Sequence, residues 1–473
     1  MKHHLSTVLI TCAALLASDL AAADVLVTNV TLVDVETGTL AEGQSVLIEN
    51  DRIAEIGVAL AAPDGTPLFD GGGYLIPGLW DSHVHIFSSP TEPDSALSLY
   101  LINGVTGIRD MGALWPIAEQ MALQARIEAG EVLGPRLVLS GAWVDASPGS
   151  WPGMFLADTP EAARAVVDRI VAEGWAAVKA YSMLDEPTYL ALAKAANGAG
   201  LAFVGHIPER VALATALAAK QAGIEHFGRV TMACSTAEAA MLTALRDVMA
   251  SGADREGIFA VMAARNRIIL ESWDEDLCQR VLASMANARM HVSPTLVVAG
   301  FYVGDRPAAD ATRVRMLPPE VRAAWSGPDF RLDAMTDEVR ALASQSIALD
   351  HRTFLMAQRA GVPILASSDA SFANPWLFHG FSLLDELDLY VTIGLTRREA
   401  LYTATVAPPR FFDLADQDGT ISPGRRADLV LLDANPLKDL ATLRRPRAVI
   451  VGGRVLDRQA LDAMEAQLLD RGE

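Results

Sequence analysis

Cysteine and basic charge are both scarce in this sequence. The chain of 473 residues has 3 cysteines, too few for a fold built on disulfides. Its 58 Asp and Glu outnumber 38 Lys and Arg, which gives a formal net charge of −20. No cluster of Lys and Arg forms a basic patch along the chain. Because an acidic surface repels phosphate groups, we expect no nucleic-acid partner and no anionic membrane partner.

Long hydrophobic runs are absent after the first residues. The chain begins with a polar stretch containing Lys2, continues with an apolar stretch over 5–16, and reaches three alanines at 21–23. This order is typical of a secretory signal, and the stretch is too short to span a bilayer. We therefore expect residues 1–23 to be a signal peptide and the mature protein to be exported, either periplasmic or secreted. A buried first helix is the alternative.

Both ends of the mature chain have the pattern of short β-strands. Residues 24–57 alternate β-branched and polar residues between turn points, and residues 418–457 repeat this pattern. Neither segment is long enough to bury a core alone. We expect 24–77 and 415–473 to form a small β-sandwich domain with a C-terminal tail, beside a larger domain over 78–414.

Between the two ends, short apolar runs alternate with alanine-rich helical stretches. Thr159 and Gly174 bound one expected helix, and Thr396 with Glu399 forms a capping box before another. Eight such repeats predict a (β/α)8 TIM-type barrel. A doubly wound sheet is the alternative, but no glycine-rich phosphate loop is present. Residues 301–333 are expected to form an irregular loop insertion. The expected strands are 75–83, 104–109, 136–143, 176–181, 201–206, 223–226, 291–298 and 363–369.

The strongest single motif is Asp81-Ser82-His83-Val84-His85 at the end of the first expected barrel strand. Alternate side chains of a strand point to the same face, so both imidazoles are expected on one side. Two imidazoles supply half of the ligands that a metal such as zinc requires. By itself, the pair could also be two ordinary exposed histidines.

Four further ionisable residues fall at or near the ends of other expected strands. Lys179 lies in an apolar run, where a buried ammonium should become neutral or gain a counter-charge unless it snorkels to water. His206 and His226 end the next two strands, and Asp369 ends the eighth. Each alone could be a packed or capping residue. Together, at the strand ends where barrel enzymes carry out chemistry, they favour one metal site.

For three other residues the sequence gives weaker predictions, and for two cysteines it gives none. Arg109 and Asp110, at the end of the second strand, are expected to form an internal ion pair, and His291 is expected to pack in the core. Cys234 and Cys278 are the cysteines left after signal cleavage, and the sequence does not decide whether they pair.

These residues resemble the amidohydrolase superfamily, specifically its binuclear members with a carboxylated lysine and the prolidase-like Xaa-Pro and Xaa-Arg peptidase group. The resemblance covers nearly the whole mature chain and implies two divalent metal ions, with zinc expected, and a carboxylated Lys179 between them. The stretches that carry it are GLWDSHVH, GVTGIRDMG, VKAY, GHIP, IEHFG, HVSPTL, SSDA, HGFSLLDEL and GTISPGRRADLVLLDANPL. The implied metal ligands are His83, His85, Lys179, His206, His226 and Asp369.

The resemblance also implies a reaction. The two ions would share a bridging hydroxide, and Asp369 would be the catalytic residue that takes its proton and passes it to the departing nitrogen. The expected substrate is a small dipeptide-like or N-acyl amino acid amide. By position, Tyr181, Arg210 and Arg229 are candidate substrate contacts, although each arginine could instead be solvated or pair with one of the many acidic residues. The family often has Gly-Thr before the last aspartate, where this chain has two serines.

Three other functions stay open. A lactonase or cyclic-amide hydrolase would use the same two metals. A mononuclear deaminase is disfavoured by Lys179, although Glu209 follows His206 at the distance such an enzyme uses. A non-catalytic exported metal-binding protein is the third alternative. The expected partner is a small molecule or dipeptide, no later segment is a membrane span, and assembly into a homo-oligomer stays open.

Overall fold

The computed structural model describes residues 24–112, 114–252, 255–303, 310–327 and 336–472. The expected signal peptide, 1–23, lies outside the described residues. Within the described part, no helix has both the length and the apolar character that crossing a membrane requires.

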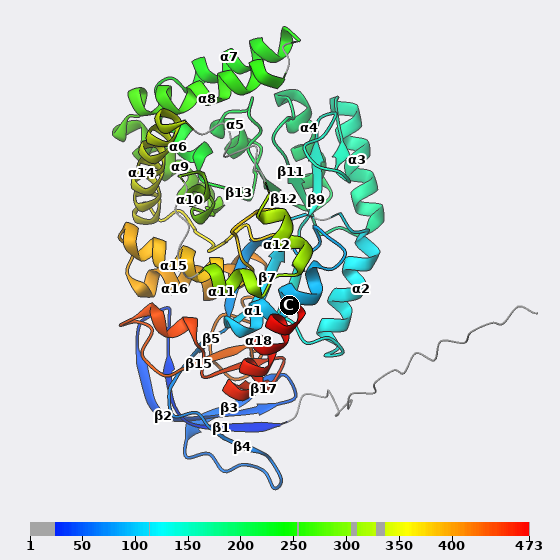
Figure 1. Ribbon diagram of the computed structural model, residues 1–473. Helices are drawn as coiled ribbons and strands as arrows, with labels where there is room; N and C mark the ends of the chain where they lie inside the picture. Colours follow the sequence, from blue (N-terminus) through cyan, green and yellow to red (C-terminus); the bar gives the residue numbers. More distant parts are fainter. Residues whose placement is uncertain (1–23, 113, 253–254, 304–309, 328–335, 473) are drawn as a thin grey trace, which may run out of the picture.

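Both ends of the chain join one mixed eight-stranded sheet, at the lower end of the molecule in Figure 1. Pairing of β5 with β15 joins the two ends, with Ile76 opposite Val430. The inner face packs a buried cluster that includes Val27, Val46 and Ile450. The expected pairing of the two ends is confirmed, whereas a two-sheet sandwich stays a prediction. The strands are β1 (Val25–Val33), β2 (Leu40–Glu49), β3 (Arg52–Val58), β4 (Leu68–Asp70), β5 (Tyr74–Pro77), β15 (Leu429–Leu432), β16 (Ala448–Val451) and β17 (Arg454–Asp457).

The middle of the chain forms parallel strands that curl into a half-barrel sheet. All ladders here are parallel. The strand orders are β6-β7-β8, β10-β9-β11-β12 and β13-β14. The complete eight-stranded barrel stays a prediction. The strands are β6 (Leu79–Val84), β7 (Val105–Asp110), β8 (Arg136–Leu139), β9 (Ala142–Asp145), β10 (Phe155–Leu156), β11 (Ala177–Ala180), β12 (Ala202–Gly205), β13 (Gly223–Glu225) and β14 (His291–Ser293).

Helices follow most of the parallel strands. The expected helix signals are confirmed at two of them: Thr159 caps α3, which Gly174 ends at φ 84°, and Thr396 with Glu399 forms a capping box on α16. The helices of the first half are α1 (Glu92–Ile102), α2 (Ile117–Glu128), α3 (Pro160–Glu173), α4 (Glu186–Gly198), α5 (Leu213–Ala218), α6 (Gly228–Ala233) and α7 (Glu238–Ala250). Those of the second half are α8 (Arg255–Ser272), α9 (Glu275–Ala288), α10 (Val297–Val303), α11 (Asp310–Arg315), α12 (Pro319–Trp325), α14 (Asp337–Arg359), α15 (Phe381–Ile393), α16 (Arg397–Thr405), α17 (Ala407–Phe411), the 3-10 helix η1 (Leu440–Arg444) and α18 (Arg458–Gly472).

Four of the expected strands are wrong in extent. The first, expected over 75–83, is divided between β5 of the terminal sheet and β6, and the third, expected over 136–143, is divided between β8 and β9, which belong to different sheets. The seventh, expected over 291–298, ends at Ser293, because Pro294 cannot donate to a ladder and Thr295 takes a left-handed φ of 47°. In the eighth, 363–369, an isolated parallel bridge joins Ile364 to β14, and just after it a second bridge joins Ala370 to β6.

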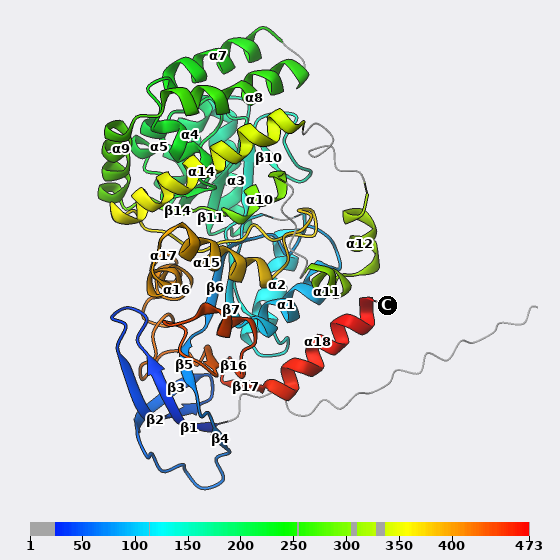
Figure 2. The same cartoon turned by 60° about the vertical axis from the view of Figure 1, so that its left-hand side comes forward.

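Helices are present in one segment expected to be irregular and in the C-terminal tail, for which no helix was predicted. The expected loop insertion over 301–333 contains α11 and α12 in its described part, and Trp325 of α12 packs against Phe372 and Phe378. The expected C-terminal tail ends in α18, which lies beside α1 (Figure 2) through a cluster that includes Leu99 and Leu461. A disulfide joins the end of α6 to α9 through the two cysteines whose pairing was open, Cys234 and Cys278.

Candidate metal centre

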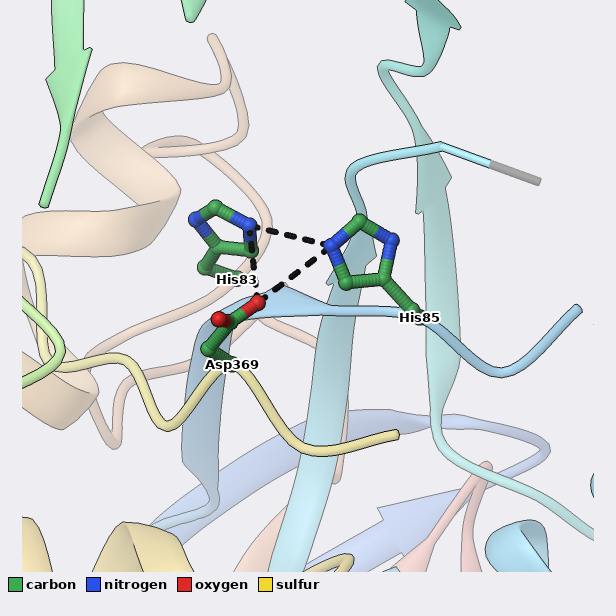
Figure 3. Close-up of side chains that lie close together, drawn as sticks. All are labelled: His83, His85 and Asp369. Carbon is green, nitrogen blue, oxygen red and sulfur yellow. Dashed lines mark hydrogen bonds and ion pairs between the residues drawn. The ribbon is translucent and has the colours of Figure 1, made fainter. Parts of the chain in front are cut away.

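Three ligand atoms converge where β6 ends. The Nε2 atoms of His83 and His85 lie 3.2 Å apart, and each lies 3.3 Å from Oδ1 of Asp369. Figure 3 shows both rings and the carboxylate turned toward one common point. His83 belongs to β6, His85 follows it directly, and Asp369 arrives from the segment bridged to β6. The HxH spacing thus directs both imidazoles to the same point, as expected.

The hydrogen bond that each ring makes through Nδ1 determines which of its two nitrogens carries the proton. His83 Nδ1 lies 2.8 Å from Glu225 Oε2, and His85 Nδ1 lies 2.9 Å from the carbonyl oxygen of Gly112. Carbonyl and carboxylate oxygens only accept, so in the neutral rings Nδ1 donates and Nε2 keeps a lone pair. Burial, assisted by the positive charge of Lys179, holds the pKa of His83 well below its usual value, so this ring is neutral. Three electron-rich atoms therefore face one another, an arrangement that a cation between them would stabilise.

Glu225 contacts the Nδ1 atom of His83, and Arg109 in turn holds Glu225. Arg109 Nη2 donates to both carboxylate oxygens of Glu225, at 2.9 and 3.0 Å, and both side chains are buried. The expected pair of Arg109 with Asp110 is therefore wrong. Asp110 instead accepts from the backbone N–H of Ile86 and Gly112, at 2.9 and 3.0 Å. Glu225 was not predicted, although a buried acid directly before a strand-end histidine was a usable signal.

Lys179 of β11 lies beside these rings without a counter-charge in contact. Its side chain is buried, with a relative exposure of 1% for the residue, and Nζ lies 3.5 Å from His83 Nε2. The ring centres of Trp143 and Tyr181 lie 5.5 and 5.7 Å away, and no described carboxylate lies within ion-pair distance. Burial lowers the pKa of Lys179 to about 8, although Glu225 and Asp369 oppose this shift. A substantial neutral fraction of this amine is therefore present near pH 8.

His206 and His226 form a second group next to the first. Their ring centres lie 5.0 Å apart, and His226 lies 5.1 Å from the ring of His83. His206 Nδ1 lies 2.8 Å from Ser182 Oγ, and His226 Nδ1 lies 2.7 Å from Thr295 Oγ1. Burial lowers the pKa of both rings. His206 Nε2 is buried with no hydrogen-bond partner, and such an orphaned acceptor fits a metal ligand.

The backbone is strained at three positions of this centre. His226, Thr295 and Asp369 have φ of 66°, 47° and 57°, in the left-handed region that residues other than glycine rarely adopt. Such conformations persist where the surrounding structure enforces them, often at functional sites. Here His226 follows β13 directly, Thr295 lies two residues after β14, and Asp369 precedes the isolated bridge at Ala370.

The carboxylate of Asp369 is held in its charged form. Burial raises its pKa, but His83, His85 and His226 together outweigh burial, so the net pKa lies below its usual value. Asn374 Nδ2 donates to the carboxylate oxygen Oδ2 at 3.2 Å and to the backbone oxygen of Asp369 at 3.0 Å. The Oδ1 atom of Asp369 therefore faces the two histidines, while its Oδ2 atom is held by Asn374.

The three candidate substrate contacts lie in different surroundings. Tyr181 stacks on the ring of His206 at 4.2 Å between ring centres, and its hydroxyl accepts from Trp151 Nε1 at 2.8 Å. Arg210 donates to the backbone oxygen of Met183, and Arg229 donates to that of Val211. Of the three, Tyr181 is thus brought to the metal centre, while both arginines bind neighbouring loops.

A cavity of about 350 Å³ opens beside the centre. His226, Asp369 and Asn374 line it, together with Asp350 of α14 and several apolar side chains. Neither Arg210 nor Arg229 is among its described lining residues. The metal-centre residues therefore face a space large enough for a small organic group.

Comparisons with known proteins give similarities of sequence over parts of the chain. Residues 283–456, which include Asp369, match the amidohydrolase family. A stretch of 89 residues is 37% identical to adenine deaminase of Listeria innocua serovar 6a, covering 19% of this chain and 15% of the deaminase. The chain therefore spans about a seventh of that relative's length.

Likeness to solved structures extends over almost the whole chain. A bottromycin amidohydrolase has a TM-score of 0.73 at 23% identity, covering 95% of this chain and 90% of that one. A Xaa-Pro dipeptidase with bound methionine in the active site has a TM-score of 0.64 at 18% identity, covering 92% and 100%. Residues 283–456 thus match the amidohydrolase family, and the mixed α/β fold of the chain is similar to the folds of these two structures.

Proposed function

We propose that this protein is a metal-dependent hydrolase that cleaves an amide bond in a small dipeptide-like or N-acyl amino acid substrate. The observation that carries the proposal is the convergence of two unprotonated Nε2 atoms and a carboxylate oxygen, with distances of 3.2 and 3.3 Å among them. The amidohydrolase-family match over 283–456 supports hydrolysis as the reaction class.

The proposed centre holds two divalent ions, with zinc expected. When bound, such ions polarise the scissile carbonyl and lower the pKa of a water molecule. The fit is supported by imidazole and carboxylate donors, which suit zinc, and by the unpartnered Nε2 of His206. The proposed ligands are His83, His85, Lys179, His206, His226 and Asp369.

Lys179 enters this proposal as a carbamate. Its amine would attack carbon dioxide, form an N–C bond and lose a proton, so that a buried cation becomes an anion. The lowered pKa supplies the neutral amine that this addition needs, and Trp143 and Tyr181 shield it. An anionic group at this position would also compensate the cationic charge that the proposed ions bring.

The other residues orient the centre and move a proton. Arg109 and Glu225 fix the orientation of His83, and Asn374 fixes that of Asp369. As the water oxygen bonds to the carbonyl carbon, Asp369 accepts a proton from the water. It then donates this proton to the amide nitrogen as the C–N bond breaks.

We also propose how the two domains are closed and where the protein is located. We propose a closed (β/α)8 barrel over 78–414, a β-sandwich from 24–77 and 415–473, and export directed by residues 1–23. The bond between Cys234 and Cys278 supports an oxidising compartment.

Deamination is the second candidate, because a short stretch resembles adenine deaminase. A deaminase would need Glu209 free to act beside His206. Its carboxylate instead pairs with Arg265, and the side chains of both residues are largely buried. We therefore favour amide hydrolysis, and a lactone or cyclic amide is the other substrate type that the same centre could hydrolyse.

Metal counting combined with a substrate panel tests the proposal. The full chain, produced with zinc and bicarbonate, should bind two ions per chain and hydrolyse at least one of a panel of Xaa-Pro, Xaa-Arg, hydrophobic dipeptide and N-acyl amino acid substrates. Lys179→Ala should lose an ion and nearly all activity, whereas Lys194→Ala, at an exposed position of α4, should retain both. Turnover of lactones or adenine alone would reject amide hydrolysis, and metal binding without any turnover would indicate a binding protein.

A further inference from the structure

Two buried carboxyl groups contact the loops that carry the candidate metal ligands, and neither is itself a proposed ligand. Glu92 begins α1 and Glu386 belongs to α15, and both residues have a relative exposure of 0%. Burial of a carboxyl group costs free energy unless its oxygens receive hydrogen bonds. The groups that donate to these oxygens therefore show which part of the fold each residue holds.

Glu92 joins the two segments that supply the first group of ligands. Its Oε1 accepts from the backbone N–H of Phe372 at 2.6 Å, three residues after Asp369. Its Oε2 accepts from Ser88 Oγ, three residues after His85. Glu92 therefore ties the loop after β6 to the loop after Asp369.

Further contacts support this junction. His379 Nε2 lies 2.8 Å from Glu92 Oε1, and His379 Nδ1 lies 2.7 Å from the hydroxyl of Tyr100. Because a carboxylate oxygen accepts, the ring of His379 donates to Glu92 from Nε2. Ser88 Oγ also lies 2.8 Å from Ser371 Oγ, so the two loops meet directly beside Glu92. Both oxygens of Glu92 are thus engaged, and its position is fixed.

Glu386 holds the turn that contacts the ring of His226. Its two oxygens accept from the backbone N–H of Leu296 and Val297, at 2.8 and 2.7 Å. These residues directly follow Thr295, whose φ is 47° and whose Oγ1 lies 2.7 Å from His226 Nδ1. Burial raises the pKa of Glu386 to about 8, although the two N–H groups oppose this shift. Carboxyl oxygens accept hydrogen bonds in either protonation state, so Glu386 can hold this turn with or without its proton.

We propose that Glu92 and Glu386 are positioning residues that act on different halves of the metal centre. Glu92 sets the separation of His85 and Asp369 through the loops that follow them. Glu386 sets the orientation of His226 through the turn that contacts its ring. The effect on the two loops does not require a metal, whereas the effect on metal affinity rests on the proposed function. Loss of either residue should disturb one half of the centre, whereas loss of a residue that merely stabilises the fold should disturb both.

Hydrogen exchange of the metal-free full chain, followed by mass spectrometry, tests these positions without metal or substrate. Glu92→Met keeps the length of the side chain and removes both acceptors. Exchange over 370–378 should then be about tenfold faster than in the wild type, as the loss of a buried acceptor predicts. Exchange over 294–300 should stay unchanged. In Glu386→Met, exchange over 294–300 should increase and that over 370–378 should stay unchanged.

Asp418→Asn is the matched control, because it changes a buried acid at the opposite ends of the parallel strands. Asp418 pairs with Arg136, the first residue of β8, whereas the metal centre lies where the strands end. This variant should leave exchange over both segments unchanged. If a Met variant fails to fold, as judged by circular dichroism, Glu92→Asp or Glu386→Asp replaces it, since the shorter side chain cannot reach the same donors. Equal loosening of both segments by each variant, or wild-type exchange in both variants, would overturn the proposal.

Zinc binding separates this inference from the proposed function. In crystals equilibrated with limiting zinc, Glu92→Met should lower the anomalous peak beside Asp369 relative to that beside His206, as a roughly ten- to hundredfold loss of affinity at one ion predicts. Glu386→Met should change this ratio in the opposite direction. A wild type that binds no zinc would count against the hydrolase, while hydrogen exchange still decides the two positions. Zinc binding with wild-type peak ratios and wild-type exchange in both variants would overturn the positioning roles and leave the hydrolase standing.

Discussion

Glu225 positions His83 in the candidate metal centre. Its carboxylate accepts from His83 Nδ1 at 2.8 Å and is itself held by Arg109. A carboxylate behind a metal-binding imidazole fixes the tautomer and raises the basicity of the ring. The sequence indicated His83 through the HxH pattern, but not Glu225, because its contact joins β13 to β6 across 142 residues of chain. Asn374 and Thr295 were missed for a similar reason, since their contacts depend on a left-handed backbone at Asp369 and His226.

Glu225→Gln should weaken metal binding without removing a ligand. The amide can still accept from His83 but carries no charge to pair with Arg109, so we expect metal affinity to fall ten- to hundredfold. Competition with a chromophoric zinc chelator measures this. Glu338→Gln, at an exposed position paired with Arg267, is the matched control. Unchanged affinity in Glu225→Gln would show that the carboxylate does not support the site.

Asp350 should make the stability of the fold depend on pH. Its pKa is raised from 3.8 to about 6, mainly by burial. The folded protein therefore retains this proton between about pH 4 and pH 6 while the unfolded chain has lost it, so the contribution of Asp350 to stability decreases as pH rises through this range. Asp350→Asn should then be more stable than the wild type at pH 8, by up to about 3 kcal/mol and less for partial exposure.

Urea denaturation of the metal-free wild type and Asp350→Asn from pH 4.5 to 8 measures this difference. The gap in unfolding free energy should grow between pH 4.5 and 6 and then stay constant. A gap that does not change with pH would mean that Asp350 titrates normally.

The positions of the strands were easier to predict than their ends. Apolar runs correctly located β6, β7, β11, β12 and β13 near the residues that carry the chemistry. The seventh and eighth strands were predicted too long, because Pro294, Thr295 and Asp369 stop regular pairing through their backbone conformations. Helices α11 and α12 were missed because proline and charged residues in 301–333 suggest a loop, whereas packing of Trp325 on Phe372 stabilises the segment.

The disulfide between α6 and α9 should stabilise the elements next to a proposed metal ligand. Cys234 and Cys278 enclose 44 residues of chain, so in the loop-entropy description their bond stabilises the fold by at most about 4 kcal/mol. The double variant Cys234→Ser, Cys278→Ser should unfold at a lower temperature than the oxidised wild type in calorimetry. The wild type treated with reductant should behave like the variant. Equal melting temperatures of all three samples would show that the bond adds nothing.

Distant parts of the chain meet in the shared sheet and in the contact of α18 with α1, and the sequence predicted the first but not the second. Alternating β patterns at both ends predicted the shared sheet, because neither end can bury its apolar face alone. The position of α18 against α1 was not predictable, since it depends on a hydrophobic cluster whose members, such as Leu99 and Leu461, are far apart in sequence. The metal centre likewise collects residues from β6, β11 and the ends of β12, β13 and the 363–369 segment, which come together only in the fold.

The most direct measurement of the central claim is a crystal structure of the zinc- and bicarbonate-treated protein with anomalous data at the zinc edge. We predict two anomalous peaks, one beside His83, His85 and Asp369 and the other beside His206 and His226, with density for a carboxyl group extending from Lys179 Nζ between them. An unmodified Lys179 amine with no anomalous peak beside the imidazoles would contradict the account.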